Sequence, residues 1–362
     1  MVSVFGARPN LMKVAPLHRA LVARSIPHRL VHTGQHFDHE MSADLADILA
    51  LPKPAFELGV GPGSGLSQLA EMLAALEQVV LAADPDLVVV VGDVTSTLAG
   101  ALTADRVGIP VAHVEAGLRS GDWRMPEERN RVIVDRISDH LFTPSADADE
   151  NLRHEGVPEG RIHRVGNVMI DSLDWILERA PVEEILASHG VRAGGYGLVT
   201  VHRQANVDDP EILRGLLAAL GRVAAGLRLL LPLHPRTRLR MEQFRLEAPP
   251  GLDVLPPLRY DHFIALLSRS VIVLTDSGGI QEEAIVLGIP CLTLRENTER
   301  PITVEMGGNQ VVGTDPDAIV TAVDSTLRDR QRYVPRRPEL WDGHAADRIG
   351  AVIEAALVRG DG

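Results

Sequence analysis

Short apolar runs alternate with helical patterns along almost the whole chain, and this alternation restricts the fold more than any other feature of the sequence. In the first half, the strand-like runs are residues 2–5, 29–32, 86–92, 111–114 and 140–143. In the second half, they are residues 197–201, 228–233, 252–255, 271–274 and 290–293. Such alternation is typical of parallel sheets covered by helices, so we predict an α/β fold.

The length of the chain and a change in its pattern predict two domains. A chain of 362 residues is longer than a single core usually supports. After residue 168 the pattern loosens into a charged helical stretch that ends at Gly194-Gly195, which we interpret as a linker region. We therefore expect two Rossmann-like domains, residues 1–168 and 169–344, that face a central cleft. Ligands bind beyond the carboxyl ends of such strands, so this cleft is the expected site. The helical segment 345–362 is expected to pack back on the first domain.

The composition excludes several classes of partner. The formal net charge is −13, and aromatic residues make up 3% of the chain, so nucleic acids and acidic membrane surfaces are poor partners. The single cysteine, Cys291, forms neither an intramolecular disulfide nor a metal cluster. No apolar run reaches the roughly 18 residues that span a bilayer, and the first residues read as a strand rather than a signal peptide. We expect a cytoplasmic protein that binds no nucleic acid, membrane or metal.

One segment combines the features of a phosphate site. Residues 274–284, LTDSGGIQEEA, join a buried strand to a helix through Ser277, Gly278 and Gly279. The glycines allow a phosphate to approach the backbone, and the N-terminus of the helix favours its charge. Ser277 either contributes to such a site or only caps the helix. Glu283, one turn into the helix, either accepts two ribose hydroxyls or lies in solvent.

Basic side chains occur at two similar places. Arg300 lies in a short polar segment after the strand 290–293, and Arg8 and Lys13 follow a glycine turn after the first strand. A guanidinium matches phosphate oxygens two at a time, so Arg300 is a candidate diphosphate clamp, although a surface salt bridge explains it equally well. We expect these elements to converge on one cleft and bind a dianionic diphosphate.

Three carboxylates are candidates for proton transfer. Asp93 and Glu115 end neighbouring strands, and Glu127 follows in the segment MPEERNR. Strand ends in one sheet bring the first two to one edge, and the loop from Glu115 returns the third. Clustered carboxylates repel each other's charge, so at least one is expected to act as a base or an acid. The alternative for each residue alone is a helix cap or a surface carboxylate.

Histidines follow three of the strands. His202 with Arg203 follows residues 197–201, His234 follows residues 228–233, and His36 lies beside Gln35 after the second strand. A histidine at such a position can donate a hydrogen bond to a departing phosphate, but it is equally consistent with a hydrogen-bonded turn residue.

Several motifs together resemble one family. In order along the chain they are FGARP, TGQH, GDVTST, HVEAGLRSGDWRMPEERNR, VTVHR, LTDSGGIQEEA and RENTERP. This set is similar to the non-hydrolysing UDP-N-acetylglucosamine 2-epimerase family over nearly the whole chain. The resemblance implies two Rossmann-like domains like those of GT-B glycosyltransferases, usually in a homodimer. It also implies anti elimination of UDP to 2-acetamidoglucal and syn re-addition, with no redox cofactor or metal.

The resemblance also implies roles for individual residues. Asp93, Glu115 and Glu127 match the catalytic carboxylates of the family, and His202 matches its histidine beside the diphosphate. The nucleotide-diphosphate contacts correspond to Arg8, Lys13, Ser277, Gly278, Gly279, Glu283 and Arg300, with Phe263 near the uracil. A second UDP-N-acetylglucosamine, which activates some members, corresponds to Gln35, His36, Gln68, Arg203 and His234.

The chain departs from the family pattern at a few positions, and these keep alternatives open. Gln204 follows Arg203 where a second arginine is usual, Val94 replaces a common threonine, and Gly308 lies where a threonine is usual. These differences concern the response to an activator and the choice of sugar, because related enzymes act on UDP-2,3-diacetamido-glucuronic acid. A GT-B glycosyltransferase, a nucleotide-sugar sensor and a hydrolysing epimerase are the alternative functions.

Overall fold

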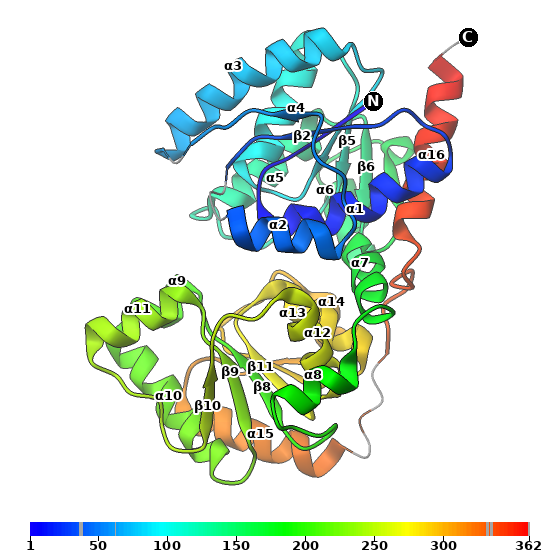
Figure 1. Ribbon diagram of the computed structural model, residues 1–362. Helices are drawn as coiled ribbons and strands as arrows, with labels where there is room; N and C mark the ends of the chain where they lie inside the picture. Colours follow the sequence, from blue (N-terminus) through cyan, green and yellow to red (C-terminus); the bar gives the residue numbers. More distant parts are fainter. Residues whose placement is uncertain (36–38, 62, 331–332, 334–335, 361–362) are drawn as a thin grey trace. The chain divides into compact units, whose positions relative to one another are not determined.

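The computed structural model describes residues 1–35, 39–61, 63–330, 333 and 336–360. The chain forms two compact units, and Figure 1 shows its elements. Unit 1 comprises Met1–Ile176 together with Glu339–Gly362, and unit 2 comprises Leu177–Pro338. Each unit holds one parallel sheet with interleaved helices, so the prediction of two Rossmann-like α/β domains is confirmed.

The sheet of unit 1 has the strand order β3-β2-β1-β4-β5-β6-β7, and all of its strand pairs are parallel. Its strands are β1 (Val2–Phe5), β2 (Arg29–His32), β3 (Phe56–Glu57), β4 (Val88–Val91), β5 (Val111–Val114), β6 (His140–Thr143) and β7 (Ile162–Arg164). Strands β1, β4 and β5 are buried along their whole length, because helices cover both faces of the sheet. This burial explains why these strands read as predominantly apolar runs, in which Ser3 and His113 are the polar residues.

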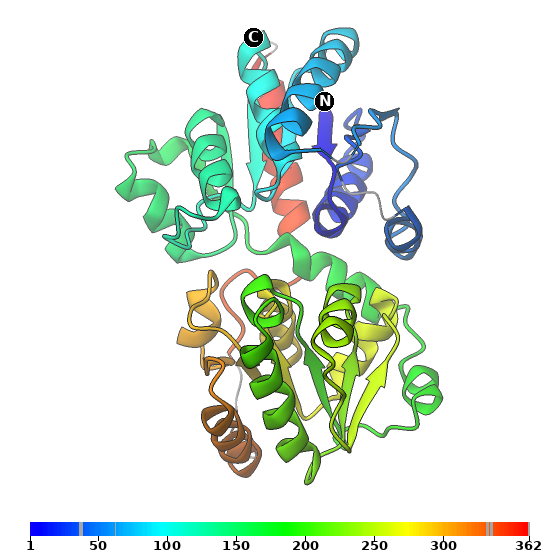
Figure 2. The ribbon, with the colours of Figure 1, turned by 90° about the vertical axis from the view of Figure 1, so that its left-hand side faces the viewer.

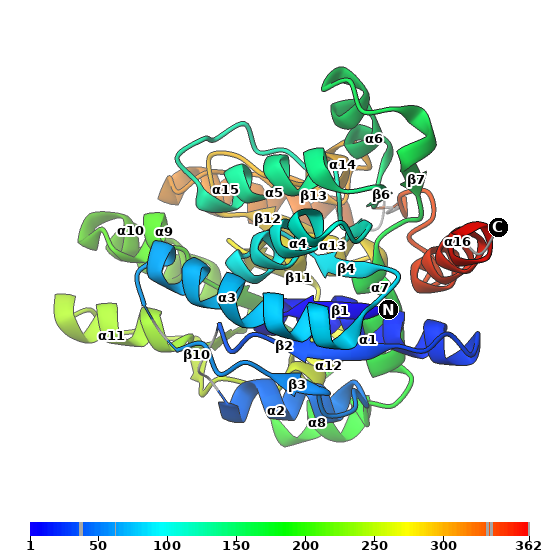
Figure 3. The ribbon, with the colours of Figure 1, turned by 90° about the horizontal axis from the view of Figure 1, so that it is seen from above.

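The helices of unit 1 form two groups on opposite faces of the sheet (Figure 3). Helix α4 packs on α3 and α5, whereas α1 packs on α2 and α16. The helices are α1 (Arg8–Ala23), α2 (His39–Ile48), α3 (Gly65–Ala83), α4 (Thr95–Val107), α5 (Pro126–Ile137), α6 (Ala146–His154), a 3₁₀ turn (Glu159–Arg161), α7 (Val168–Leu177) and α16 (Ala345–Gly360).

Hydrogen bonds tie the C-terminal helix α16 to unit 1. The buried indole of Trp341 donates to the Pro144 carbonyl oxygen at 2.8 Å. The Asp171 carboxylate accepts from the backbone N–H groups of Ala345 and Ala346 at the start of α16. These contacts and the packing on α1 make residues 345–360 part of unit 1.

Helix α3 is unusually apolar for its position. By length and composition alone it is able to cross a membrane, and 17% of that stretch is buried. One face, with Met72, Leu76 and Val80, packs into the core of the unit, whereas the side chains of Leu66 and Leu81 are exposed. The spacing of the buried residues is that of a helix with a single covered face.

The sheet of unit 2 has the strand order β10-β9-β8-β11-β12-β13 and is also parallel. Its strands are β8 (Gly197–Thr200), β9 (Leu229–Pro232), β10 (Leu252–Leu255), β11 (Ile272–Thr275), β12 (Cys291–Thr293) and β13 (Asn309–Val311). Helix α10 packs beside α15 on one side, and α8 packs beside α12 on the other (Figure 2). The helices are α8 (Val182–Ser188), α9 (Gln204–Val207), α10 (Pro210–Ala224), α11 (Pro235–Phe244), α12 (Tyr260–Arg269), α13 (Gly278–Leu287), α14 (Pro301–Glu305) and α15 (Pro316–Asp329).

Candidate functional site

In unit 1, two of the candidate carboxylates lie at the carboxyl ends of adjacent strands. Val91 at the end of β4 is in register with Val114 at the end of β5, so Asp93 and Glu115 follow neighbouring strand ends. Glu115 has a left-handed backbone, with φ of 73°, which is a costly conformation for a residue with a side chain. Strain of this kind is typical of positions where function fixes the direction of a side chain.

Glu115 forms an ion pair with Lys13 of α1, and both side chains are largely buried. Gly92 lies directly above this pair. A Cβ atom at Gly92 would come 2.8 Å from Lys13 Nζ and 3.4 Å from Glu115 Oε2, and the φ of this residue is +69°. Glycine at this position therefore allows the lysine and the glutamate to meet beneath the turn.

Asp93 forms an ion pair with Arg131 of α5, a side chain that is almost completely buried. The same guanidinium lies 2.5 Å from Glu128 Oε2, and Glu128 accepts hydrogen bonds from the backbone N–H groups of Ser120 and Gly121. Arg131 therefore links Asp93 to the loop between β5 and α5. Glu127 is half-buried in the first turn of the same helix.

A buried histidine that sequence reasoning did not single out supports this edge of the sheet. His113 of β5 has Nδ1 at 2.6 Å from Asp135 Oδ1 and Nε2 at 2.7 Å from the Gly92 carbonyl oxygen. Both ring nitrogens therefore face oxygen atoms, one of a carboxylate and one of a backbone carbonyl. Burial alone would raise the pKa of Asp135, but His113 and Arg119 outweigh it and hold that pKa below its usual range.

The glycine turn after β1 is packed too closely for any other residue. A Cβ atom at Gly6 would lie 2.0 Å from Thr33 Oγ1 and 2.1 Å from Ser96 Oγ. Asn10 fixes the turn, because its Oδ1 accepts from the N–H of Ala7 at 3.0 Å and its Nδ2 donates to the Val91 carbonyl oxygen at 3.2 Å. Helix α1 begins directly after the turn, at Arg8.

Two of the residues assigned to a second nucleotide site lie together in unit 1. Gln35 Oε1 accepts from the N–H and the hydroxyl of Ser96 at 3.0 and 2.6 Å. Gln68 Nε2 donates to the carbonyl oxygens of Gln35 and Gly61. His36, the third residue of this group in the first half of the chain, lies outside the described residues.

In unit 2, the turn between β11 and α13 leaves an open space. Ser277 is the N-cap residue of α13, but its side chain makes no capping hydrogen bond. A Cβ atom at Gly278 or Gly279 would approach only Glu299 Oε2 at 3.8 Å or Glu283 Oε1 at 4.0 Å. Neither glycine has a positive φ. The protein's own packing therefore does not require these glycines, and the space they leave is available to a ligand.

Glu283 is buried rather than solvated. Its Oε1 accepts a hydrogen bond from the Tyr260 hydroxyl, and its Oε2 is buried with no hydrogen-bond partner. Burial, aided by Glu282, raises the pKa of Glu283 to about 8, although the bond from Tyr260 lowers it. A buried carboxyl with an unused oxygen fits a ligand that brings hydroxyl donors. Phe263 lies half-buried one turn after Tyr260 in α12.

Arg300 is not a surface side chain. Its guanidinium Nε lies 2.6 Å from Glu282 Oε1, and its side chain is 13% exposed. The carboxylate of the preceding Glu299 accepts hydrogen bonds from both terminal nitrogens of Arg295, at 2.8 and 2.9 Å. Burial opposes ionisation of Glu299, but Arg295 outweighs it and lowers the pKa of Glu299 to about 2. The surface salt bridge considered for Arg300 is therefore wrong, because the pair is largely shielded from solvent.

The histidines after β8 and β9 are neighbours. The rings of His202 and His234 have centroids 5.3 Å apart, and His202 Nδ1 lies 3.0 Å from Asp276 Oδ1. Arg203 Nη2 lies 3.7 Å from Glu299 Oε1. The carboxyl edge of the unit 2 sheet thus carries two imidazoles, two glycines and several arginine–glutamate pairs. Within the described ranges, no group of three or more His, Cys, Asp or Glu side chains is arranged to hold a metal ion.

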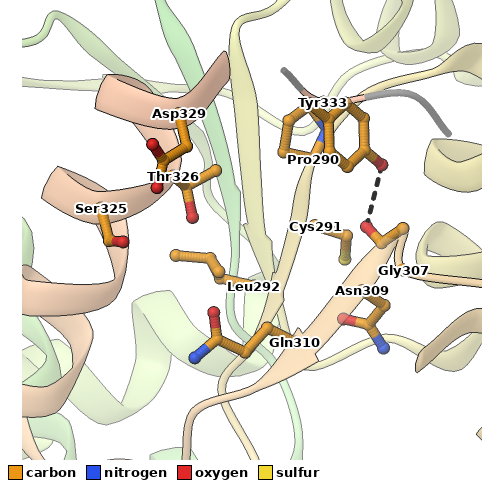
Figure 4. Close-up of a pocket in the computed structure, with 11 residues that line it drawn as sticks. Pro290, Cys291, Leu292, Gly307, Asn309, Gln310, Ser325, Thr326, Asp329 and Tyr333 are labelled. Carbon is orange, nitrogen blue, oxygen red and sulfur yellow. Dashed lines mark hydrogen bonds between the residues drawn. The ribbon is translucent and has the colours of Figure 1, made fainter. Parts of the chain in front are cut away.

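A separate pocket of about 280 Å³ lies near the amino ends of β12 and β13 (Figure 4). Its lining includes Cys291, Asp329 and Tyr333, and none of the candidate site residues. The Tyr333 hydroxyl donates to the Gly308 carbonyl oxygen at 3.2 Å, and burial raises the pKa of Cys291 to about 12. A thiol held in this neutral form is a poor nucleophile, so the pocket offers no obvious chemistry.

Comparison with known proteins identifies the family. Residues 19–354 match the family described as UDP-N-acetylglucosamine 2-epimerase. The UDP-N-acetylglucosamine 2-epimerase of Methanocaldococcus jannaschii is 38% identical over 97% of both chains. The UDP-2,3-diacetamido-2,3-dideoxy-D-glucuronate 2-epimerase of Pseudomonas aeruginosa is 41% identical over 91% of this chain and 94% of its own length.

A solved structure agrees with these sequence relationships. The crystal structure of the M. jannaschii UDP-GlcNAc 2-epimerase in complex with UDP-GlcNAc and UDP matches with a TM-score of 0.88 and 37% identity, over 98% of this chain and 99% of the other. Sequence and fold therefore point the same way over nearly the whole length. This chain belongs to the UDP-N-acetylglucosamine 2-epimerase family and is an isomerase.

Proposed function

We propose that this protein interconverts UDP-N-acetylglucosamine and UDP-N-acetylmannosamine without hydrolysis and without a redox cofactor. The observation that carries the proposal is the pair of carboxylates, Asp93 and Glu115, at adjacent strand ends, each held by a buried basic side chain. Such fixed carboxylates suit proton transfer at carbon.

The nucleotide half of the proposal rests on unit 2. The open turn at Gly278 and Gly279 receives a phosphate, and Arg300 supplies a guanidinium to the diphosphate. The unpartnered oxygen of Glu283 accepts ribose hydroxyl hydrogens, and Phe263 lies near the uracil. Ser277 and His202 are further proposed contacts of the diphosphate, and the family resemblance assigns Arg8 and Lys13 to the same group.

The proposed reaction needs only acid–base groups and a phosphate cradle. A carboxylate takes the C2 proton while the C1–O bond to UDP breaks, and the electron pair of the C–H bond becomes the second bond between C1 and C2. Loss of the diphosphate builds positive charge at C1, which acidifies the C2 hydrogen. A protonated carboxyl returns a proton to the other face as UDP adds back syn. Asp93, Glu115 and Glu127 are the candidates for these roles.

A second nucleotide-sugar site is proposed from the same family resemblance. Gln35 and Gln68 contact each other in unit 1, and Arg203 and His234 lie near His202 in unit 2. Together with His36, these residues are assigned to a second UDP-N-acetylglucosamine that activates the enzyme. Substrate dependence of the initial rate that is sigmoidal for the wild type and hyperbolic for Gln68→Ala would support this assignment.

We also propose that the protein is a cytoplasmic homodimer. Helix α3 supports the dimer, because the side chains of Leu66 and Leu81 on its uncovered side are 78% and 59% exposed. A second copy of this chain would shield these side chains from water. Sedimentation of the wild type as a dimer, and of Leu66→Glu/Leu81→Glu as a monomer, is the expected result.

Isotope exchange tests the proposed reaction. In deuterated water, incubation with UDP-N-acetylglucosamine alone is expected to place deuterium at C2 of both epimers. A GT-B glycosyltransferase requires an acceptor and gives no exchange, and a hydrolysing epimerase releases free UDP. The same exchange experiment should also be done with UDP-2,3-diacetamido-glucuronic acid, because the P. aeruginosa relative is named for that sugar. Absence of exchange with every UDP-2-acetamido sugar would refute the proposal.

A further inference from the structure

The buried carboxylate of Asp276 makes two distinct sets of contacts at the carboxyl edge of unit 2. Its side chain has no exposed surface. Oδ2 accepts hydrogen bonds from the backbone N–H of His202 at 2.9 Å, the backbone N–H of Arg203 at 2.8 Å and Asn206 Nδ2 at 3.1 Å. These three bonds hold the backbone where the chain leaves β8.

The other oxygen of Asp276 faces the imidazole of His202. Nδ1 of His202 lies 3.0 Å from Oδ1 as an ion pair, and Oδ1 accepts no hydrogen bond. Burial opposes ionisation of Asp276, but His202 and the two backbone N–H groups outweigh it and hold its pKa below the usual value. Because an ionised carboxylate only accepts hydrogen bonds, this contact favours the form of the ring with hydrogen on Nδ1.

The orientation of the ring follows from this contact. With Nδ1 directed at Oδ1, Nε2 is on the opposite side of the imidazole, and the His202 side chain is 34% exposed. The ring of His234 neighbours that of His202, with centroids 5.3 Å apart, and the guanidinium of Arg203 lies 3.7 Å from Glu299 Oε1. The pairs of Glu299 with Arg295 and of Glu282 with Arg300 are further charged groups at this edge.

We propose that Asp276 is a positioning residue for the epimerase reaction, because it holds His202 with Nδ1–H toward Oδ1 and Nε2–H toward the diphosphate of departing UDP. The inference rests on the proposed function. The negative charge of Asp276 stabilises the imidazolium, and the imidazolium stabilises the charge that develops on the leaving group. Asp276 itself touches neither sugar nor phosphate.

The substitution Asp276→Asn separates the two contacts. Three donors converge on Oδ2, so the amide carbonyl of the asparagine takes that place and its NH₂ group faces His202 Nδ1. Nδ1 then becomes an acceptor, and the hydrogen of the neutral ring moves to Nε2. The backbone anchors remain while the tautomer and the charge of His202 change.

The test combines imidazole ¹⁵N NMR with kinetics. His202→Gln identifies the His202 signals. The wild type is expected to show hydrogen on Nδ1, and UDP is expected to shift the Nε2 resonance. Asp276→Asn is expected to show the Nε2–H tautomer and to lower kcat by about a hundredfold, with KM changed by less than about threefold.

Thr237→Val is the matched control, because the buried Thr237 hydroxyl donates to the carbonyl oxygen of Val201, directly before His202. This variant is expected to retain hydrogen on Nδ1 of His202 and most of kcat. Equal losses of kcat in Thr237→Val and Asp276→Asn would overturn the proposal. An Nε2–H tautomer in the wild type, or no response of His202 to UDP, would also overturn it. These NMR outcomes do not depend on turnover, so they stand apart from a failure of the proposed function.

Discussion

His113 Nε2 lies 2.7 Å from the carbonyl oxygen of Gly92, the residue directly before Asp93. The other ring nitrogen of His113, Nδ1, contacts Oδ1 of Asp135. Oδ2 of Asp135 accepts a hydrogen bond from the N–H of Gly117 at 3.1 Å and lies 2.8 Å from Arg119 Nη1. A single buried ion pair thus fixes the ends of both β4 and β5. The position of Asp93 and Glu115 therefore depends on a histidine that lies beneath them.

Replacing this histidine should damage both stability and activity. His113→Leu removes one partner of the Asp135 carboxylate and the donor to the Gly92 carbonyl, while Arg119 still pairs with Asp135. The expected cost is therefore below the roughly 3–5 kcal/mol of a buried charge that loses every partner. Displacement of Asp93 should also lower the rate of C2 exchange by tenfold or more, roughly the scale for a misplaced catalytic group. Urea unfolding and deuterium exchange measure the two effects.

A double-mutant cycle provides the control for this pair. His113→Leu and Asp135→Asn together should destabilise less than the sum of the single changes, by about 1–3 kcal/mol. Additive effects would show that the histidine and the aspartate act independently.

Substitution of the candidate catalytic carboxylates should lower turnover without weakening UDP binding. Asp93→Asn and Glu115→Gln are each expected to lower turnover about a hundredfold or more, the scale for loss of a positioned acid or base. UDP affinity should change little, because the nucleotide contacts are proposed to lie mainly in unit 2. Initial rates and calorimetric titration with UDP provide the measurements. Near-normal turnover in both variants would mean that the bases have been assigned wrongly.

Glu283 predicts a pH dependence of stability. Its pKa is raised from 4.5 to about 8 by burial, so folding favours the protonated carboxyl. The protonated Glu283 carboxyl contributes its full stabilisation below pH about 4.5, and this contribution is lost as the pH rises through about 8. The free energy of unfolding then decreases by at most about 1.4 kcal/mol per pH unit. In Glu283→Gln, the free energy of unfolding should therefore fall less steeply as the pH rises. Above pH about 8 the variant should be more stable than the wild type. Urea unfolding at several pH values measures this effect.

The same substitution should weaken UDP binding, because the amide replaces one carboxyl oxygen with an NH₂ group, which donates hydrogen bonds and cannot accept them. Glu305→Gln, at an exposed position of α14, is the control for loss of one negative charge. If both variants show the wild-type pH profile, Glu283 is ionised in the folded protein and the interpretation is wrong.

The sequence predicted the fold well because the central strands are covered on both faces. The runs that form β4, β5, β8 and β11 are predominantly apolar, with His113, Thr200 and Thr275 as their polar residues. The strands that it missed are short edge strands with polar residues, β3 with FE, β7 with IHR and β13 with NQV. An edge strand needs no apolar run, so its pairing is visible only in three dimensions.

The site was predictable where strand ends carry polar residues, and less so where the partner is distant in sequence. Asp93 and Glu115 follow from the strand pattern, but Arg131 and Asp135 approach from α5. His113 reads as a core position of an apolar strand. Burial of Glu283 was also missed, since it depends on Tyr260, 23 positions away in the sequence. Charge partners of this kind come from tertiary packing rather than local pattern.

Two glycines of unit 2 should respond oppositely to the same substitution. A Cβ atom at Gly308 would lie 2.5 Å from Ile285 Cγ1, so Gly308→Ala should destabilise the fold by about 1–3 kcal/mol with little effect on UDP affinity. A Cβ atom at Gly278 meets nothing closer than 3.8 Å, so Gly278→Ala should unfold like the wild type. It should nevertheless weaken UDP binding by tenfold or more, because the methyl group occupies the space proposed for a phosphate and a lost charge-assisted hydrogen bond costs about 1.5–3 kcal/mol. Urea unfolding and UDP titration of both variants measure the contrast. Wild-type affinity in Gly278→Ala would place the phosphate elsewhere, since no other property of this turn calls for glycine.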